Sequence, residues 1–222
     1  MGRKTIMLKK STTSDILIER KFIEDSIIKY NISKYLGTAL TSAGFSSVEI
    51  QKTPMLTRII IHVLNPGRVI GRGGRTLDIL TETIKKKFNV ENPQINIVKI
   101  ENRMLDPMIV AKNIANKFER GLNTRKIIQQ TLKSIFENGA IGAEIVVSGK
   151  LAAKGARGKT LRKSIGYLPK AGDVTKLVNY GMATAYPKYG AIGVKVKIVP
   201  FGTVFPDRKI RKLEIPKQIL KS

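Results

Sequence analysis

A glycine-rich segment at residues 65–75 is the feature that most constrains how this chain can fold. It follows the β-branched run 59–63 and precedes an amphipathic run, so it is predicted to connect a strand to a helix that begins at about Gly74. Three glycines can take positive φ and let a polyanion approach the main-chain N–H groups: Gly71, Gly73 and Gly74. Three arginines around them can form forked hydrogen bonds to phosphate oxygens: Arg68, Arg72 and Arg75. The segment therefore suits a phosphate backbone.

The spacing of the glycines separates three kinds of phosphate-binding loop. A Walker A loop fails because Arg72 stands where the second glycine would follow Gly67, and a dinucleotide fingerprint counted from Gly71 ends on Thr76. The remaining pattern is G-x-x-G, in residues 71–74, with an apolar pair before it and a helix after it. A KH domain clamps a short run of single-stranded nucleotides with such a loop. An ordinary strand-to-helix turn is the alternative, and the flanking segments favour the KH domain.

Charge points to the same class of partner. The 222 residues carry 41 Lys and Arg against 16 Asp and Glu, a formal net charge of +25. Nucleic acid fits this surplus better than an anionic membrane, because no basic amphipathic helix with a bulky aromatic face appears. With no cysteine and only His62 as histidine, we expect no zinc site, metal or cofactor. No apolar run approaches the ~20 residues that span a bilayer, so a cytoplasmic protein is expected.

The periodicity of apolar residues predicts an α+β fold with an N-terminal KH domain over residues 19–104. The predicted elements are, in order, a helix from Glu19 to about Ala43, strands at 48–53 and 57–63, a helix ending at Phe88 and a strand at 94–100. A helix plus a three-stranded sheet with a G-x-x-G loop is the type II KH arrangement. Residues 1–18 are predicted to be a basic flexible tail that touches RNA, although their composition superficially suits an organellar transit peptide.

Residues 105–200 are predicted to form a two-layer α/β domain, with two helices on a mostly antiparallel sheet. The pattern predicts helices at 108–120 and 124–138 and strands at 143–148, 176–186 and 192–199. Residues 149–172 are basic, glycine-rich and free of acids before Asp173, and they are predicted to be a loop that follows RNA phosphates. Residues 201–222 are predicted to be a basic C-terminal tail.

Basic side chains in this second domain are the other candidate RNA contacts. Three lie on the predicted helix 124–138, away from its apolar stripe: Arg125, Lys126 and Lys133. A solvated helix face would also explain these three. Six more lie in the predicted loop: Lys150, Lys154, Arg157, Lys159, Arg162 and Lys163.

Several stretches resemble the family of small-subunit ribosomal protein three in its archaeal and eukaryotic form. Besides the glycine-rich segment they are Glu19-Arg20-Lys21-Phe22-Ile23, Glu91-Asn92-Pro93-Gln94, residues 139–151 and Ile192-Gly193-Val194-Lys195-Val196. The Ser-Gly-Lys-Leu block that ends at Leu151 is far more specific than the G-x-x-G alone. Together the stretches run from about residue 19 to about residue 200.

The resemblance implies a KH domain and a C-terminal α/β domain in the head of the small ribosomal subunit. There the protein would hold rRNA, contact neighbouring head proteins and line the entrance of the mRNA channel. In bacterial relatives, basic residues at the start of the helix after an Arg-Gly break touch incoming mRNA and assist its unwinding. The matching positions in this chain are Arg125, Lys126 and the uncharged Gln129.

Two other functions remain open from the residues alone. A free-standing KH regulator would bind particular single-stranded RNAs away from the ribosome. An enzyme acting on nucleic acid would need a cluster of carboxylates or a lysine activated by burial, but the acids are spread out as ordinary surface charges: Asp15, Glu24, Asp78, Glu101 and Glu144. A structural RNA-binding protein without chemistry of its own is the favoured prediction.

Overall fold

The computed structural model describes residues 18–53, 56–90, 92–151, 157–188 and 190–206. The chain folds into helices packed on two separate sheets whose described pairings are antiparallel, which confirms the predicted α+β class. The chain divides into two compact units, one ending at Val98 and the other beginning at Lys99. Each unit has its own buried core.

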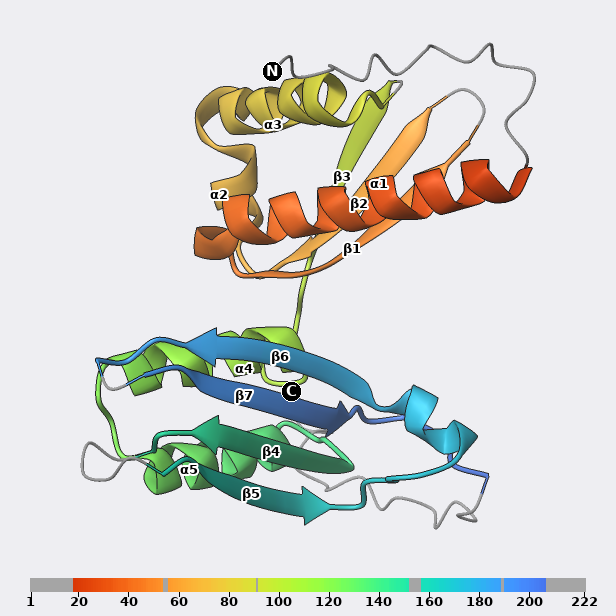
Figure 1. The fold of residues 1–222 in the computed structure, drawn as a ribbon. Helices are drawn as coiled ribbons and strands as arrows, with labels where there is room; N and C mark the ends of the chain where they lie inside the picture. Colours follow the sequence, from red (N-terminus) through yellow and green to blue (C-terminus); the bar gives the residue numbers. More distant parts are fainter. Residues whose placement is uncertain (1–17, 54–55, 91, 152–156, 189, 207–222) are drawn as a thin grey trace, which may run out of the picture. The chain divides into compact units, whose positions relative to one another are not determined.

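The first unit has the predicted helix and three-stranded sheet of a type II KH domain, together with a short helix α2 (Figure 1). Its elements are α1 (Ile18–Ala39), a 3₁₀ turn at Thr41–Ala43, β1 (Phe45–Lys52), β2 (Thr57–Val63), α2 (Pro66–Ile70), a 3₁₀ turn at Arg72–Gly74, α3 (Arg75–Phe88) and β3 (Pro93–Lys99). The strand order is β1-β2-β3, and β1 and β2 are antiparallel. The segment 66–70, predicted to be part of a joint, is thus helical, and the G-x-x-G lies between two helices.

Alternation along β2 explains how this unit forms its core. Ile59, Ile61 and Val63 are fully buried, whereas Arg58 is exposed on the other face. Side chains two apart on a strand share a face, so one face of the sheet receives both long helices. The helical residues that complete this core are Ile32 and Leu36 from α1 and Leu80 and Ile84 from α3.

Helix α1 carries a second apolar stripe that no described residue covers. Phe22, Ile23, Ile27 and Tyr30 are 53–76% exposed. At 100° per residue, Ile23, Ile27 and Tyr30 lie on the side of the helix opposite the buried Ile32. The first half of α1 therefore contributes little to the core of the unit.

The second unit has two helices on one face of a four-stranded sheet, as predicted (Figure 1). Its elements are α4 (Pro107–Glu119), α5 (Thr124–Glu137), β4 (Gly142–Gly149), β5 (Lys159–Gly166), a 3₁₀ turn at Asp173–Leu177, β6 (Asn179–Ala185) and β7 (Ile192–Val199). The order is β5-β4-β7-β6, with every neighbouring pair antiparallel. Helix α4 packs on β6 and β7, and α5 packs on β4 and β5.

The prediction of a loop over residues 149–172 is wrong, because this segment contains strand β5. Leu161 pairs with Val147 and Ile165 pairs with Ala143, so these two apolar side chains point to the helix-covered face. They are the only residues of β5 that pack on the core. An edge strand with so few apolar positions has almost no hydrophobic pattern, which is why the sequence did not predict it. The strand predicted at 176–186 begins later, at Asn179, because a 3₁₀ turn occupies Asp173–Leu177.

Two local contacts position helix α4 on this sheet. Asp106 caps α4, since its side chain accepts hydrogen bonds from the N–H groups of Met108 (2.9 Å) and Ile109 (3.1 Å). Gly181 of β6 lies against the start of the same helix, and a Cβ there would be 2.3 Å from the carbonyl carbon of Pro107.

The structure also differs at the predicted C-terminal tail. Phe205 is buried, and its ring meets that of Tyr167 edge-on, with 5.2 Å between the ring centroids. Residues up to 206 are therefore part of the folded unit. The remaining predicted tail residues, 1–17 and 207–222, lie outside the described residues.

Candidate nucleic-acid interface

The G-x-x-G loop has the backbone conformation that its glycines predict. Gly71 (φ 73°, ψ −172°), Gly73 (φ 62°, ψ 27°) and Gly74 (φ 80°, ψ −7°) all have positive φ. Gly71 ends α2 and its N–H donates to the carbonyl oxygen of Gly67 at 3.0 Å, while Gly74 stands at the N-cap of α3. The loop thus connects α2 to α3 within four residues through three glycines of positive φ.

The three glycines have different reasons to lack a side chain. A Cβ on Gly71 would lie 2.1 Å from the hydroxyl oxygen of Thr76, so packing excludes it. A Cβ on Gly73 would meet no atom within 4 Å, and one on Gly74 would reach only a carboxyl oxygen of Asp78 at 4.0 Å. The outer side of the loop at Gly73 is therefore open to a ligand that approaches the main chain.

The charges around the loop are mostly free to bind an anion. Arg72 and Arg75 are exposed and form no ion pair with any described residue. No side chain caps the N-terminus of α3, so its leading N–H groups add a partial positive charge. Asp78 is the acidic residue of that first turn and opposes it. Arg68 differs, because its Nη1 donates to the carbonyl oxygen of Ser42 at 2.7 Å and so braces the loop against the segment after α1.

The three basic side chains predicted on α5 form the α5 row on the surface of that helix: Arg125, Lys126 and Lys133. Asn123 begins the helix, with its side chain accepting a hydrogen bond from the N–H of Arg125 at 3.1 Å. Arg125, Lys126 and Lys133 are exposed, as predicted from the helical spacing. Lys133 has one loose ion pair, with 3.8 Å between its Nζ and Oε1 of Glu137.

Strand β5 separates the other predicted contacts instead of gathering them. Lys163 pairs with Ile145 on the helix-covered face, and Lys159 shares that face because it lies four residues away. Arg162 points to the helix-free face. Lys150 and Arg157 are exposed next to the strand, and Lys154 lies outside the described residues.

Glu144 is not the ordinary surface charge that its sequence context suggests. It lies on the helix-free face of the central strand β4, yet it is 2% exposed. Its Oε1 accepts a hydrogen bond from Nε of Arg162. The hydrogen bond and charge of Glu144 raise the pKa of the Arg162 guanidinium above its usual value. The predicted RNA contact Arg162 therefore also has a structural partner within the sheet.

One lysine of the second unit has a perturbed titration. Burial lowers the pKa of Lys112 on α4, and the nearby Asp106 carboxylate partly offsets this. Lys112 is partly buried and belongs to the helix that Asp106 caps. Its altered pKa is therefore explained by its position in the fold.

The described part of the chain contains no group of three or more His, Cys, Asp or Glu that could hold a metal ion. No helix in that part is long and apolar enough to cross a membrane. His62 is half-buried, with its Nε2 3.7 Å from Oε1 of Glu49.

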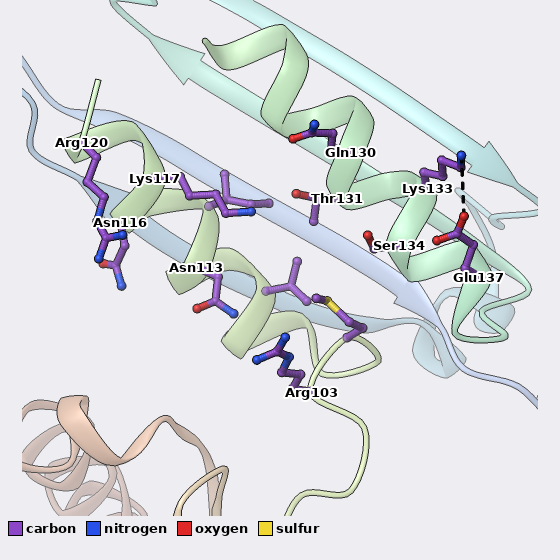
Figure 2. A pocket seen from close by; sticks show the side chains of 13 residues that line it. Arg103, Asn113, Asn116, Lys117, Arg120, Gln130, Thr131, Lys133, Ser134 and Glu137 are labelled. Atoms are coloured by element: carbon purple, nitrogen blue, oxygen red, sulfur yellow. Dashed lines mark ion pairs between the residues drawn. The ribbon is translucent and has the colours of Figure 1, made fainter. Parts of the chain in front are cut away.

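Sequence reasoning missed a polar groove between α4 and α5, which Figure 2 shows from close by. Its volume is about 630 Å³. The polar side chains that line it are Arg103, Asn113, Asn116, Lys117, Arg120, Gln130, Thr131, Lys133, Ser134 and Glu137. The spacing of the α4 members matches a helix face, but nothing in the sequence places that face beside α5.

Comparison with known proteins addresses both units. A family model described as "KH domain" matches residues 31–105, and one described as "Ribosomal protein S3, C-terminal domain" matches residues 114–198. The chain is 40% identical over 197 residues to small ribosomal subunit protein uS3 of Methanocaldococcus jannaschii, which covers 88% of this chain and 94% of that protein. The chain belongs to the uS3 family.

Two other uS3 proteins are similar to this chain over a region of nearly the same length. The uS3 protein of Methanospirillum hungatei is 39% identical over 191 residues, covering 86% of this chain and 80% of the relative. That of Methanothermobacter thermautotrophicus is 37% identical over 193 residues, covering 86% and 74%. Both units of the fold thus lie within the uS3 similarity, which confirms the resemblance found in the sequence.

Proposed function

We propose that this chain is a structural constituent of the small ribosomal subunit, which holds rRNA and lines the entrance of the mRNA channel. The observation that carries this proposal is the arrangement of free cations on two folded units of a uS3-family chain. One unit presents Arg72 and Arg75 beside an open glycine turn, and the other presents Arg125 and Lys126 at the start of α5. The role is to bind and position RNA in the ribosome, without catalysis.

The two units contribute different terms to binding. Phosphate neutralisation by the many surface cations would dominate affinity, and each contacted phosphate would steepen the salt dependence by roughly 0.7–0.9 in a log–log plot. The G-x-x-G loop would fix the geometry of a short single strand through its main chain. No aromatic residue lies within the glycine-rich segment, so base stacking is a minor term there.

Contact with incoming mRNA is assigned to the exposed face of α5. Arg125 and Lys126 stand in the first turns of the helix, where they project freely into solvent. Gln129 continues this face without charge, so a role in unwinding would depend on fewer cations than in the bacterial relatives. Neighbouring proteins of the subunit head are the remaining proposed partners.

A sucrose-gradient experiment tests the proposal. A lysate is separated at low and at high magnesium, and this chain is followed by immunoblot. Migration with the small subunit through a moderate salt wash is expected. A chain confined to the top fractions would overturn the ribosomal role and favour the alternative, a free-standing KH regulator of single-stranded RNAs.

A further inference from the structure

The groove between α4 and α5 has a strongly one-sided charge. Its lining includes four cations, Arg103, Lys117, Arg120 and Lys133, against the single carboxylate of Glu137. Lys133 is loosely paired with that carboxylate, and the other three cations form no ion pair with any described residue. Because uncompensated cations that line one concave surface raise the local concentration of anions, the groove favours a polyanion.

The neutral groups of the groove add hydrogen-bonding capacity. Within the described part of the chain, the amide side chains of Asn113, Asn116 and Gln130 have no hydrogen-bond partner. Amides can donate to phosphate oxygens and accept from ribose hydroxyls. An inorganic anion would use only the donors, whereas a nucleic acid strand would use both functions.

The floor of the groove is apolar. Val110 and Ile114 close it from below at 1% and 0% exposure, and the partly buried Met104 beside them supplies apolar surface that a ligand can reach. A polar rim over an apolar floor suits a ligand with both charged and flat apolar parts. A nucleotide strand has these parts, since its phosphates can meet the rim while a sugar or base edge packs against Met104.

The shape of the groove selects a single strand. Polar residues run in two rows, from Asn113 to Arg120 along α4 and from Gln130 to Glu137 along α5 (Figure 2). Seven residues of helix span about 10 Å, so each row is long enough for a short stretch of backbone. A volume of about 630 Å³ is that of a site for a drug-sized ligand, far too small for a duplex.

We propose that the groove between α4 and α5 binds the phosphodiester backbone of single-stranded RNA, with Lys117 and Arg120 as its main phosphate contacts. This inference rests on the proposed RNA-binding function and assigns to it a site beside the α5 row. Lys133 belongs to both the row and the groove, so a strand that crosses the outer face of α5 can continue into the groove.

The test compares two double variants of the full chain with equal charge changes. The groove variant is Lys117→Gln with Arg120→Gln, and the control is Lys188→Gln with Lys195→Gln, at two exposed lysines that do not line the groove. Binding to a labelled short oligouridylate is measured by fluorescence anisotropy over a range of salt concentrations. The groove variant should bind at least several-fold more weakly, and its log–log salt slope should fall by about 1.4, that is roughly 0.7 for each lost contact.

Equal losses in the two variants would overturn the inference, because net charge alone would then explain both. An oligoglutamate peptide serves as the second probe. If the groove variant lost affinity for the peptide and kept its affinity for oligouridylate, the groove would be a protein site and the RNA inference would be wrong.

Failure of this inference can be distinguished from failure of the proposed function. A third variant, Arg125→Gln with Lys126→Gln, reports on the α5 row alone. If only that variant lost RNA binding, the proposed function would be retained and the groove inference would be rejected. If the wild-type chain were absent from small subunits, the proposed function itself would be rejected. In assembled subunits, a groove variant that incorporates poorly points to rRNA as the strand, and one that incorporates but binds mRNA weakly points to mRNA.

Discussion

Arg162 on β5 donates a hydrogen bond from Nε to Oε1 of Glu144 on β4, and this carboxyl group is 2% exposed. The two strands are neighbours in the sheet, so the pair joins its edge strand to its centre. A buried carboxylate without a partner is costly. Arg162 was predicted as an RNA contact, and any loss of RNA binding after its substitution must be separated from a loss of folding.

Removal of Arg162 is expected to destabilise the second unit. Arg162→Ala should lower the urea midpoint of unfolding, because Glu144 would stay buried without its hydrogen-bond donor. Lys163→Ala is the matched control, since Lys163 is exposed on the same strand and forms no ion pair with a described residue. Glu144→Gln in the Arg162→Ala background should recover part of the loss, because a neutral amide costs less to bury than a charge. Equal midpoints for the two single variants would contradict this account.

The glycines of the G-x-x-G loop should differ in their tolerance of a side chain. Gly73→Asn should cost little, since φ 62° and ψ 27° lie in the left-handed region that Asn tolerates and the site is open. Gly71→Asn should cost about 1–3 kcal/mol or more, because its φ and ψ are accessible essentially to glycine alone and a Cβ would collide with Thr76. Urea unfolding of both variants measures the difference. Similar costs would show that the loop is not held in this conformation.

Charge reversal at the loop should separate RNA contact from assembly. Arg72→Asp with Gly73→Asp places two carboxylates where the main chain is open, so binding of short single strands should weaken strongly. Incorporation into the small subunit should be largely retained, because other surfaces would hold rRNA. Gly73→Asn alone controls for the backbone change. Loss of the double variant from small-subunit gradient fractions would refute this division of roles.

Reversal of the cations around β5 should have the opposite effect. Lys154→Glu, Arg157→Glu and Lys159→Glu together should reduce rRNA binding and subunit incorporation, and mRNA contact through α5 should remain. A control with the same charge change uses three exposed lysines elsewhere: Lys85→Glu, Lys188→Glu and Lys195→Glu. Filter binding to small-subunit rRNA compares the two. Unchanged rRNA binding by the first variant would count against the assignment of this basic segment.

Two glycines in the sheet of the second unit offer a matched test of packing. Gly181→Ala should destabilise this unit strongly, since the Cβ would lie within 2.3–2.5 Å of backbone atoms of Pro107 and Met108. Gly193→Ala should be nearly neutral, because its Cβ would first meet the hydroxyl oxygen of Ser148 at 3.5 Å. Thermal unfolding followed by circular dichroism checks both. A Gly181→Ala variant as stable as the wild type would mean that α4 can move away from β6 at little cost.

The elements that the sequence predicts well are those in which a local pattern and burial agree. The alternation in β2, the G-x-x-G spacing and the apolar stripe of α5 each depend on residues close in sequence, and the structure has all three. Strand β5 was not predicted from the sequence because it pairs through its backbone and buries only Leu161 and Ile165. Its cations looked like those of a loop, and pairing with a strand that begins 17 residues earlier leaves no local trace.

Contacts between distant residues account for what was missed in the site. Arg68 braces Ser42 across 26 residues of chain, which no spacing rule predicts. Glu144 accepts a hydrogen bond from Arg162 across 18 residues of chain, on a strand that the sequence did not predict. The groove depends on Asn113 and Gln130 lying on two helices that both pack on the same sheet, and no local pattern in the sequence places those helices side by side.

The two walls of the groove rest on different halves of the sheet, with α4 on β6 and β7 and α5 on β4 and β5 (Figure 1). The distance between the helices is therefore set by the strands beneath them, before any ligand arrives. A substitution at a buried strand position such as Ile145 or Val196 would be transmitted outward as a change in groove width, because packed cores carry strain to their surface. Conservative substitutions at buried strand positions, which have no contact with solvent, would in this way change the width of the groove.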